Sequence, residues 1–305
     1  YITQDMNTTD NADFARVVTP QIVDIIAMAD LYGLAPEIFD DNTRYGVNSN
    51  LGTYMDIVFS GLTDATFTHP NWNPGQKVAF TIMDTGGSDL IDFSTDTEKQ
   101  RVDLRQEKLS DVYGVDGSMV IARGTVIEKY IGGTRGDDIT SNDAANLLNG
   151  RNGADTLKGL KGADELKAGN GNDEVFGGEG ADELRGGNGT DILRGGKGKD
   201  LIRGGVSKDT IYGQTGDDTL YGNGGGDIFV YQNNGDRDVI KDFQNNKDIL
   251  QLDDKLWTGT LTVNQVFDQF ASNSNGDAVL NFGSGNRITI ENLSIAVLKD
   301  DVEII

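Results

Sequence analysis

Carboxylates recur at a fixed nine-residue spacing through the middle of the chain. From Gly132 to Val230 the sequence divides into eleven nine-residue units without an insertion. The eighth place of every unit is apolar, from Ile139 in the first unit to Phe229 in the last. The sixth place is Asn146 in the second unit and aspartate in the others, namely Asp137, Asp155, Asp164, Asp173, Asp182, Asp191, Asp200, Asp209, Asp218 and Asp227. One fixed carboxylate and one fixed apolar residue per short period predict a stacked repeat architecture.

The residue types of one unit predict its local structure. Glycines at places 1, 2 and 4 permit positive φ and close chain approach, so we expect a turn over the first six residues. The last three residues, with one inward apolar side chain, predict a very short strand. Two units then complete one coil of a parallel roll, with equivalent residues of every second unit about 4.8 Å apart. The aspartates should therefore stack in two rows, one containing Asp137, Asp155, Asp173, Asp191, Asp209 and Asp227, and the other containing Asn146, Asp164, Asp182, Asp200 and Asp218.

Stacked carboxylates at this spacing require a cation. Unit charges about 5 Å apart repel by roughly 1 kcal/mol in water and by several kcal/mol at a protein surface. One apolar residue per unit offsets only about 1.5–3 kcal/mol. A hard divalent ion with oxygen ligands, Ca²⁺ rather than Mg²⁺ or Zn²⁺, suits carboxylates combined with carbonyls of glycine turns. The expected ligands are the ten sixth-place aspartates and the turn residues Gly150, Gly153, Gly159, Gly162, Gly169, Gly171, Gly177, Gly178, Gly180, Gly186, Gly187, Gly189, Gly195, Gly196 and Gly198.

Two other interpretations of the glycine-rich text are disfavoured. A flexible linker would keep no apolar register. A dinucleotide- or phosphate-binding loop requires a helix after the glycines, and none is predicted here.

Composition restricts the partners. The formal net charge of −23 argues against nucleic acid or an anionic membrane as a partner. No apolar run approaches 18 residues, so we expect no membrane insertion. The chain has no cysteine and shows no signal peptide of the Sec type. It begins at Tyr1 rather than at a methionine, which suggests a processed or incomplete product.

The flanks of the repeats predict further elements. Thr19 and Pro20 begin a helix that Gly33 ends, and residues 41–131 form a β-rich segment that leads into the roll of residues 132–230. Residues 231–305 should form a C-terminal β cap, with a capping box at Thr262 and Gln265 and a hairpin around Gly285. The predicted fold class is all-β: a parallel β-roll with flanking β-sandwich-like strands and two short helices.

The units resemble the RTX nonapeptide GGxGxDxUx, which forms a calcium-binding β-roll. Outside the repeats, PQIVDIIAMADLYG (20–33), YGVNSN (45–50), FTIMDTGGSDLIDFS (80–94), VIARGTVIEKYIGG (120–133), NDAANLLNG (142–150) and DVIKDF (238–243) resemble the C-terminal two thirds of the serralysins, secreted RTX-bearing zinc metalloproteases of the metzincin group. This resemblance implies a helical remnant of the protease domain over residues 1–40. It also implies further calcium ligands, namely Asp84, Gly86, Gly87, Asp89, Glu128, Asp242 and Asp248.

The resemblance does not extend to the zinc centre. Serralysins bind zinc through HExxHxxGxxH, whereas this sequence contains one histidine, His69, for which we expect no ligand role. The chain alone should be inactive, and zinc would belong only to a catalytic half that precedes Tyr1. The resemblance then implies that Tyr1 is a tyrosine close to that zinc. The tail at 301–305 resembles an acidic-apolar signal for type I secretion, although an ordinary final strand is an alternative.

Two functions remain open. In the first, the chain is the calcium-binding roll of a secreted, extracellular serralysin-like metalloprotease, which folds outside the cell, stabilises the protease half and directs type I secretion. In the alternative, it is a complete non-enzymatic RTX protein with a structural, adhesive or surface-layer role. Hydrolysis by carboxylates of this chain has little support, because the repeat pattern already explains them.

Overall fold

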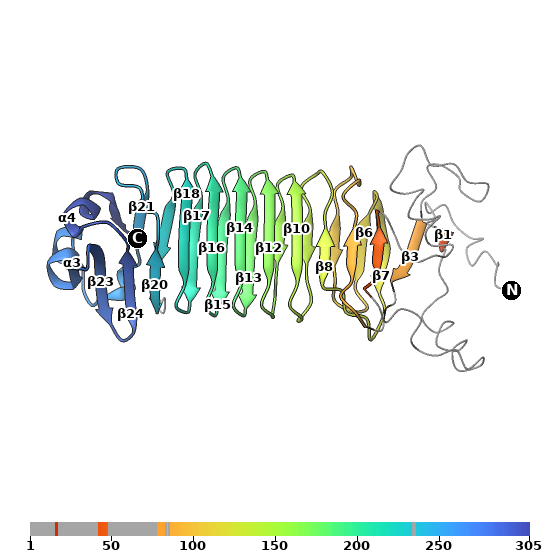
Figure 1. The fold of residues 1–305 in the computed structure, drawn as a ribbon, viewed down its shortest axis with the longest axis horizontal. Coiled ribbons are helices and arrows are strands. Elements are labelled where there is room, and N and C mark those ends of the chain that lie inside the picture. The colour runs from red at the N-terminus through yellow and green to blue at the C-terminus, as the bar shows by residue number, and fades with distance from the viewer. Residues whose placement is uncertain (1–15, 18–41, 48–77, 83, 85, 234–235) are drawn as a thin grey trace.

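The chain is wound into an elongated β-solenoid with a mixed β and helical cap at its C-terminal end (Figure 1). The computed structural model describes residues 16–17, 42–47, 78–82, 84, 86–233 and 236–305. The predicted helix at 20–33, Tyr1 and His69 lie outside these residues. Two long sheets form the solenoid, and the predicted parallel β-roll is confirmed.

The first sheet has thirteen strands. In spatial order they are β1 (Arg16–Val17), β3 (Val78–Ile82), β7 (Val115–Ile121), β6 (Leu109–Val112), β5 (Arg101–Asp103), β9 (Asp138–Thr140), β11 (Thr156–Lys158), β13 (Glu174–Glu179), β15 (Ile192–Lys197), β17 (Thr210–Thr215), β19 (Ile228–Tyr231), β21 (Ile249–Leu252) and β25 (Val302–Ile304).

The second sheet has twelve strands. Their order is β2 (Arg44–Gly46), β4 (Leu90–Asp92), β8 (Lys129–Ile131), β10 (Leu147–Asn152), β12 (Glu165–Asn170), β14 (Glu183–Asn188), β16 (Leu201–Val206), β18 (Thr219–Gly224), β20 (Arg237–Ile240), β24 (Asn286–Ile290), β23 (Asp277–Gly283) and β22 (Ala271–Ser274).

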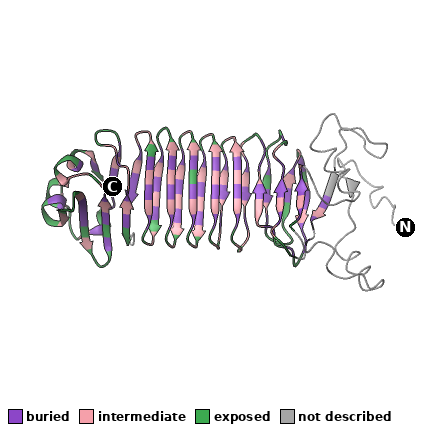
Figure 2. Cartoon of the chain, in the orientation of Figure 1, coloured by how far each residue is buried: buried purple, intermediate pink, exposed green. Residues whose placement is uncertain are grey.

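The register follows the period of the sequence. Successive strands of one sheet pair residues 18 apart, as Leu148 with Leu166 and Leu157 with Val175. The eighth-place side chains therefore stack between the sheets, and each is at most 2% exposed. Figure 2 shows this interior as the buried stripes along the strands.

The strands of the central coils are longer than predicted. Strand β13, for example, contains six residues, because the first three residues of the next unit continue the pairing. Gly178 pairs with Gly196 at φ values of 117°, a conformation that only glycine adopts readily. The turn is therefore confined to places 4 to 6, and the expected six-residue turn is wrong for these coils.

The flanks continue the same two sheets. Strands β2, β4 and β8 extend the second sheet on the N-terminal side, and β5, β6, β7 and β3 extend the first. On the C-terminal side, α3 (Val263–Phe270) begins with the predicted capping box of Thr262 and Gln265. The predicted hairpin is β23 and β24, and β25 at the tail pairs with β21.

Short helical segments complete the cap. The 3-10 helices are η1 (Asp254–Leu256) and η2 (Lys299–Asp301), and α4 (Ile295–Leu298) was not predicted. None of the helices in the described part of the chain is long and apolar enough to cross a membrane.

Candidate metal-binding edges

The sixth-place aspartates form two continuous rows, which we call the first edge and the second edge. In each row the Oδ1 atom of one aspartate accepts a hydrogen bond from the backbone N–H of the sixth-place residue one coil earlier. Asp164 N donates to Asp182 Oδ1 at 2.8 Å on the second edge, and Asp173 N donates to Asp191 Oδ1 at 2.9 Å on the first. The structure thus places Asp137, Asp155, Asp173, Asp191, Asp209 and Asp227 on one edge and Asn146, Asp164, Asp182, Asp200 and Asp218 on the other.

The second carboxylate oxygen, Oδ2, lacks a hydrogen-bond donor in most of these aspartates. Among the described residues, Oδ2 is buried without a hydrogen-bond partner in Asp155, Asp164, Asp173, Asp182, Asp191, Asp200, Asp209, Asp218 and Asp227. Asn146 has the same feature at Oδ1. A buried acceptor without a partner costs about 1–3 kcal/mol, and more when it is charged. Nine repetitions of that cost indicate a ligand that the protein itself does not provide.

Glycines create the space around these oxygens. A Cβ atom at Gly195 would lie 2.3 Å from Asp200 Oδ2, and one at Gly186 would lie 2.3 Å from Asp191 Oδ2. The other first-place glycines proposed as ligands, Gly150, Gly159 and Gly177, contact the Oδ2 atom of their own unit in the same way. The carboxylate can therefore approach the backbone only because these positions lack a side chain.

The second- and fourth-place glycines bring backbone carbonyls to the edges. A Cβ at Gly180 would lie 1.5 Å from the carbonyl oxygen of Gly162, and one at Gly187 would lie 2.1 Å from that of Gly169. Equivalent close approaches to a backbone carbonyl one coil earlier occur at Gly153, Gly162, Gly169, Gly171, Gly178, Gly189, Gly196 and Gly198. Each edge thus contains carboxylate and carbonyl oxygens, the donor set that calcium prefers.

Burial makes the ionised rows unfavourable without a counter-ion. It raises the pKa of Asp155, Asp164 and Asp200 to about 7 and that of Asp209 to about 8, and neighbouring aspartates on the row add to the effect. The backbone hydrogen bond to Oδ1 opposes this increase but does not cancel it. At neutral pH these positions favour a bound proton or a bound cation.

Both rows continue beyond the repeats at the C-terminal side. Asp227 N donates to Asp248 Oδ1 at 3.0 Å, and Asp218 N donates to Asp238 Oδ1 at 3.1 Å. Asp238 was missed from the sequence because its spacing from Asp218 is 20 residues rather than 18. The available signal was its position two residues before the inward Ile240, which is the relation of every sixth place to its eighth.

Asp242 and Asp248 have protein donors on both oxygens. Asp242 accepts hydrogen bonds from the backbone N–H groups of Gly222 (2.9 Å) and Asn223 (3.0 Å), so it lies beside the end of strand β18 rather than in a row. Asp248 accepts from Gln244 N through Oδ2 at 2.7 Å. Burial raises the pKa of Asp248, and the charge of Asp242 raises it further, so the two expected ligands lie near each other.

The second edge also continues on the N-terminal side. Asp89 N donates to Glu128 Oε2 at 2.8 Å, and Thr43 N donates to Asp89 Oδ1 at 2.8 Å. Burial raises the pKa of Asp89 to about 6, and the charges of Asp84 and Glu128 raise it further. The expected ligands Asp89 and Glu128 are therefore in contact, and Asp84 is close enough to influence them.

Asp84 is held separately from this contact. Its Oδ2 accepts a hydrogen bond from the Tyr45 hydroxyl at 3.0 Å, and its Oδ1 accepts one from Gly86 N at 3.1 Å. Gly87 follows with φ 104°, which completes the turn toward Asp89.

Side chains alone do not form a metal cluster. Within the residues that the structure describes, no three His, Cys, Asp or Glu side chains gather in a metal-ligating arrangement. A cation on either edge would therefore take most of its ligands from backbone carbonyls, in agreement with the donor set found there.

Comparison with known proteins identifies the family. Residues 37–303 match the family model described as "Peptidase M10 serralysin C terminal". The chain is 42% identical over 129 residues to a serralysin of Photorhabdus laumondii, and 37% identical over 129 residues to metallopeptidase AprA of Pseudomonas marginalis. Each match covers 42% of this chain and 24% of the relative, so the chain matches about a quarter of the length of these proteins.

Among solved structures, the extracellular lipase LipA from Serratia marcescens is similar at 14% identity and a TM-score of 0.31. That alignment covers 92% of this chain and 69% of the lipase. The family model, by contrast, extends through both sheets and the cap, and the chain belongs to the serralysin C-terminal family of M10 peptidases.

Proposed function

We propose that this chain is a calcium-binding β-roll that folds outside the cell as part of a secreted serralysin-type metalloprotease. The observation that carries the proposal is the buried, unpartnered Oδ2 atom repeated in nine aspartates. The residues that would hold calcium are the second-edge and first-edge aspartates from Asp155 to Asp227, Asn146 through Oδ1, and the carbonyls of the turn glycines. Asp89 and Glu128 would contribute to a further site. Bound calcium would supply the positive charge that the two rows lack.

The proposed role is metal-coupled folding. Extracellular calcium modules bind with dissociation constants of about 10⁻⁴–10⁻³ M, so in a calcium-poor cytosol the repeats would remain unfolded. An unfolded chain suits passage through a type I secretion channel, and calcium outside the cell would then order the coils. The last residues, 301–305, would serve as the secretion signal before they pair as strand β25.

The protease assignment rests on the relatives. Proteins named serralysin and metallopeptidase share the matched region, and the zinc-binding sequence HExxHxxGxxH is absent from the sequence described here. We therefore place zinc chemistry in a catalytic half outside this sequence, which the roll would stabilise. A protein without such a half, with a structural or adhesive role, is the alternative, and the sequence encoded before Tyr1 distinguishes the two.

Calcium titration tests the central claim. The chain is treated with EDTA, returned to millimolar Ca²⁺ and followed by far-UV circular dichroism, with calorimetry giving the number of bound ions. We expect the strand signal to fall in EDTA and to return with several Ca²⁺ per chain, whereas equal Mg²⁺ should not restore it. Unchanged strand content in EDTA, or no bound calcium, would contradict the proposal.

A further inference from the structure

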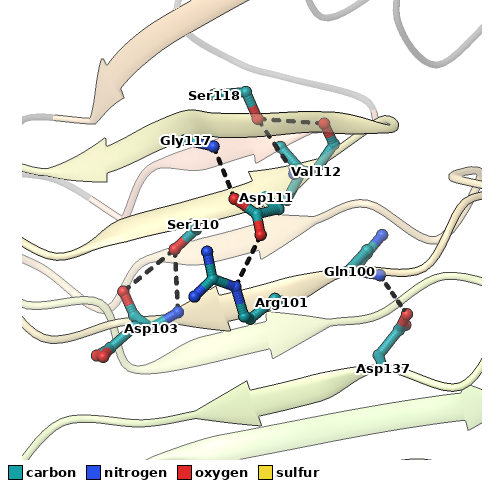
Figure 3. Close-up of polar contacts among 9 residues, drawn as sticks. All are labelled: Gln100, Arg101, Asp103, Ser110, Asp111, Val112, Gly117, Ser118 and Asp137. Carbon is teal, nitrogen blue, oxygen red and sulfur yellow. Dashed lines mark hydrogen bonds and ion pairs between the residues drawn. The ribbon is translucent and has the colours of Figure 1, made fainter.

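The first repeat differs from the others in how its carboxylate is used. Asp137 Oδ1 accepts a hydrogen bond from Gln100 N at 2.8 Å (Figure 3). Its Oδ2 accepts one from Gly133 N at 3.0 Å. The other nine repeat aspartates each keep a buried Oδ2 atom without a partner in the described part of the chain. Asp137 therefore offers no free oxygen for a metal at the position where sequence reasoning expected a ligand.

Arginines occupy two glycine places beside this carboxylate. Arg135 stands at the fourth place of its unit and donates from Nε to the carbonyl oxygen of Thr97 at 2.6 Å. Arg151 stands at a second place and donates from Nη1 to the carbonyl oxygen of Ser94. Both guanidinium groups thus bring positive charge and hydrogen-bond donors to carbonyls of the segment 94–97, which closes the first edge at this end.

A buried amide completes the closure. Gln100 is 0% exposed, yet each of its polar groups has a partner. Its Nε2 donates to Asp96 Oδ2 at 3.0 Å, and its Oε1 accepts from the Tyr130 hydroxyl at 2.5 Å. Asp96 Oδ2 also accepts from Tyr113 N at 2.7 Å. The buried carboxylates of Asp96 and Asp137 are therefore both satisfied by protein donors, as buried polar networks require.

This end of the solenoid also has a larger apolar core. Eleven apolar side chains are buried between residues 90 and 131, whereas most units of the roll contribute only the one at the eighth place. Phe93 makes edge-to-face contacts with Phe80, Tyr113 and Tyr130, at ring-centroid distances of 6.2, 5.2 and 6.1 Å. Aromatic burial of this kind stabilises the segment without a bound ion.

We infer that residues 93–140 form a coil whose first edge is closed by protein donors instead of a cation, so that this coil stays folded without calcium and provides the surface on which the metal-dependent coils assemble. Strands β8 and β9 present the pairing edges to which β10 and β11 add in register. The inference rests on the calcium role proposed for the later repeats. It removes Asp137 from the ligand set and assigns Arg135 and Arg151 the charge that a cation supplies elsewhere.

Hydrogen exchange of the full chain, with and without EDTA, tests this inference. We expect backbone amides of residues 93–121 and 129–140 to stay protected in EDTA, while those of residues 156–224 lose protection. Loss of protection in both regions together would overturn the inference and leave the calcium proposal intact. Protection of residues 156–224 in EDTA would instead refute the calcium proposal.

Two substitutions locate the effect in the named residues. Arg135→Gly restores the fourth-place glycine, and it should lower protection at 94–100 in EDTA by at least about tenfold through loss of a charge-assisted hydrogen bond. Arg105→Ala is the control, because among the described residues its guanidinium pairs with Asp103 alone, on the exposed surface. Equal protection in the two variants would exclude the role of Arg135.

Calcium stoichiometry gives a second measurement that does not depend on the arginines. Asp137→Asn should leave the number of bound Ca²⁺ ions unchanged, whereas Asp182→Asn should reduce it. A lower stoichiometry in Asp137→Asn would show that Asp137 is a ligand and would overturn the inference.

Discussion

The central repeats and the C-terminal cap belong to the same two sheets, but they bury different interiors. Strands β19, β21 and β25 continue the first sheet of the roll into the cap, and β20 and β24 continue the second. Within the roll each unit buries one residue at the eighth place, such as Leu184 or Leu193. The cap instead gathers aromatic rings, with Phe282 at 5.2 Å from Phe270 and 5.8 Å from Trp257.

The polar groups of the two regions differ as well. The repeats contain buried carboxylate oxygens that lack a protein donor, whereas the cap begins helix α3 with a complete capping box and forms a hairpin between β23 and β24. The same two sheets therefore depend on a ligand for the carboxylates in the roll and on protein contacts alone in the cap. We expect the roll, together with the row members Asp238 and Asp248, to respond to calcium and pH, and the cap beyond them to respond to neither.

Acid should replace calcium in the roll but leave the cap unaffected. Burial raises the pKa of Asp155 and Asp200 to about 7 and that of Asp209 to about 8. In EDTA the folded roll then binds protons that the unfolded carboxylates release, because their pKa is about 3.9 when unfolded. The stability of the metal-free roll should consequently be greatest near pH 4 and fall as the pH rises from about 4 to about 8.

Circular dichroism in EDTA across pH 4–9 measures the roll, and Trp257 fluorescence in a Trp72→Phe background measures the cap. The comparison fails if the metal-free roll gains stability as the pH rises, or if both signals change together.

A glycine-to-alanine substitution should also destabilise the roll far more than it destabilises the cap. Gly180 has φ 150°, and a Cβ there would lie 1.5 Å from the Gly162 carbonyl oxygen, so Gly180→Ala combines backbone strain with overlap. Its cost should be about 3 kcal/mol or more in the presence of calcium. Gly283→Ala in the cap has φ 81° but open space, and should cost about 1 kcal/mol from strain alone. Thermal unfolding of both variants measures the difference, and similar midpoints would show that the close carbonyl approach does not constrain the roll.

The nine-residue repeat correctly predicted the contacts that depend only on its period. Leu148 and Leu166 pair as expected, because an 18-residue coil leaves no other register for the inward side chains. The length of the strands could not be obtained in this way, since Gly178 and its equivalents were assigned to turns from their residue type. These glycines continue a strand at positive φ because they pair with the neighbouring coil, which a single unit does not contain.

The candidate ligands could likewise be predicted only where their contacts lie within the repeat pattern. Asp137 matches the repeat pattern fully, yet its oxygens are engaged by Gly133 and by Gln100, which lies 37 residues earlier in the chain. Asp238 was hidden for the opposite reason, because the segment before it adds two residues to the period. In both cases the deciding partner lies outside the unit that carries the pattern.

Removing one charge within the roll should change stability in opposite directions with and without calcium. Asp182→Asn keeps an oxygen that can accept from Asp164 N, but replaces the unpartnered Oδ2 atom by an amide. With calcium it should destabilise by about 1–3 kcal/mol, and in EDTA it should be neutral or stabilising because one buried charge is gone. Thermal unfolding under both conditions measures this.

The matched control for Asp182→Asn lies on the surface of the same coil. Glu179 is about half exposed and pairs with Lys197 at 2.6 Å, so Glu179→Ala should change stability much less than Asp182→Asn does. A loss of stability in Asp182→Asn that is the same with calcium and in EDTA would mean that the carboxylate is structural rather than a metal ligand.

The smallest expected effect belongs to the cap. The Thr262 side chain accepts from Gln265 N, and the Gln265 side chain accepts from Thr262 N at 2.9 Å, which together satisfy two N–H groups at the start of α3. Thr262→Ala should cost about 1 kcal/mol. Because α3 packs Val266 and Phe267 into the apolar cap and not against the carboxylate rows, this cost should be equal with calcium and in EDTA. Trp257 fluorescence during urea unfolding measures it, and a cost that appears only with calcium would show that the cap depends on the ions of the roll.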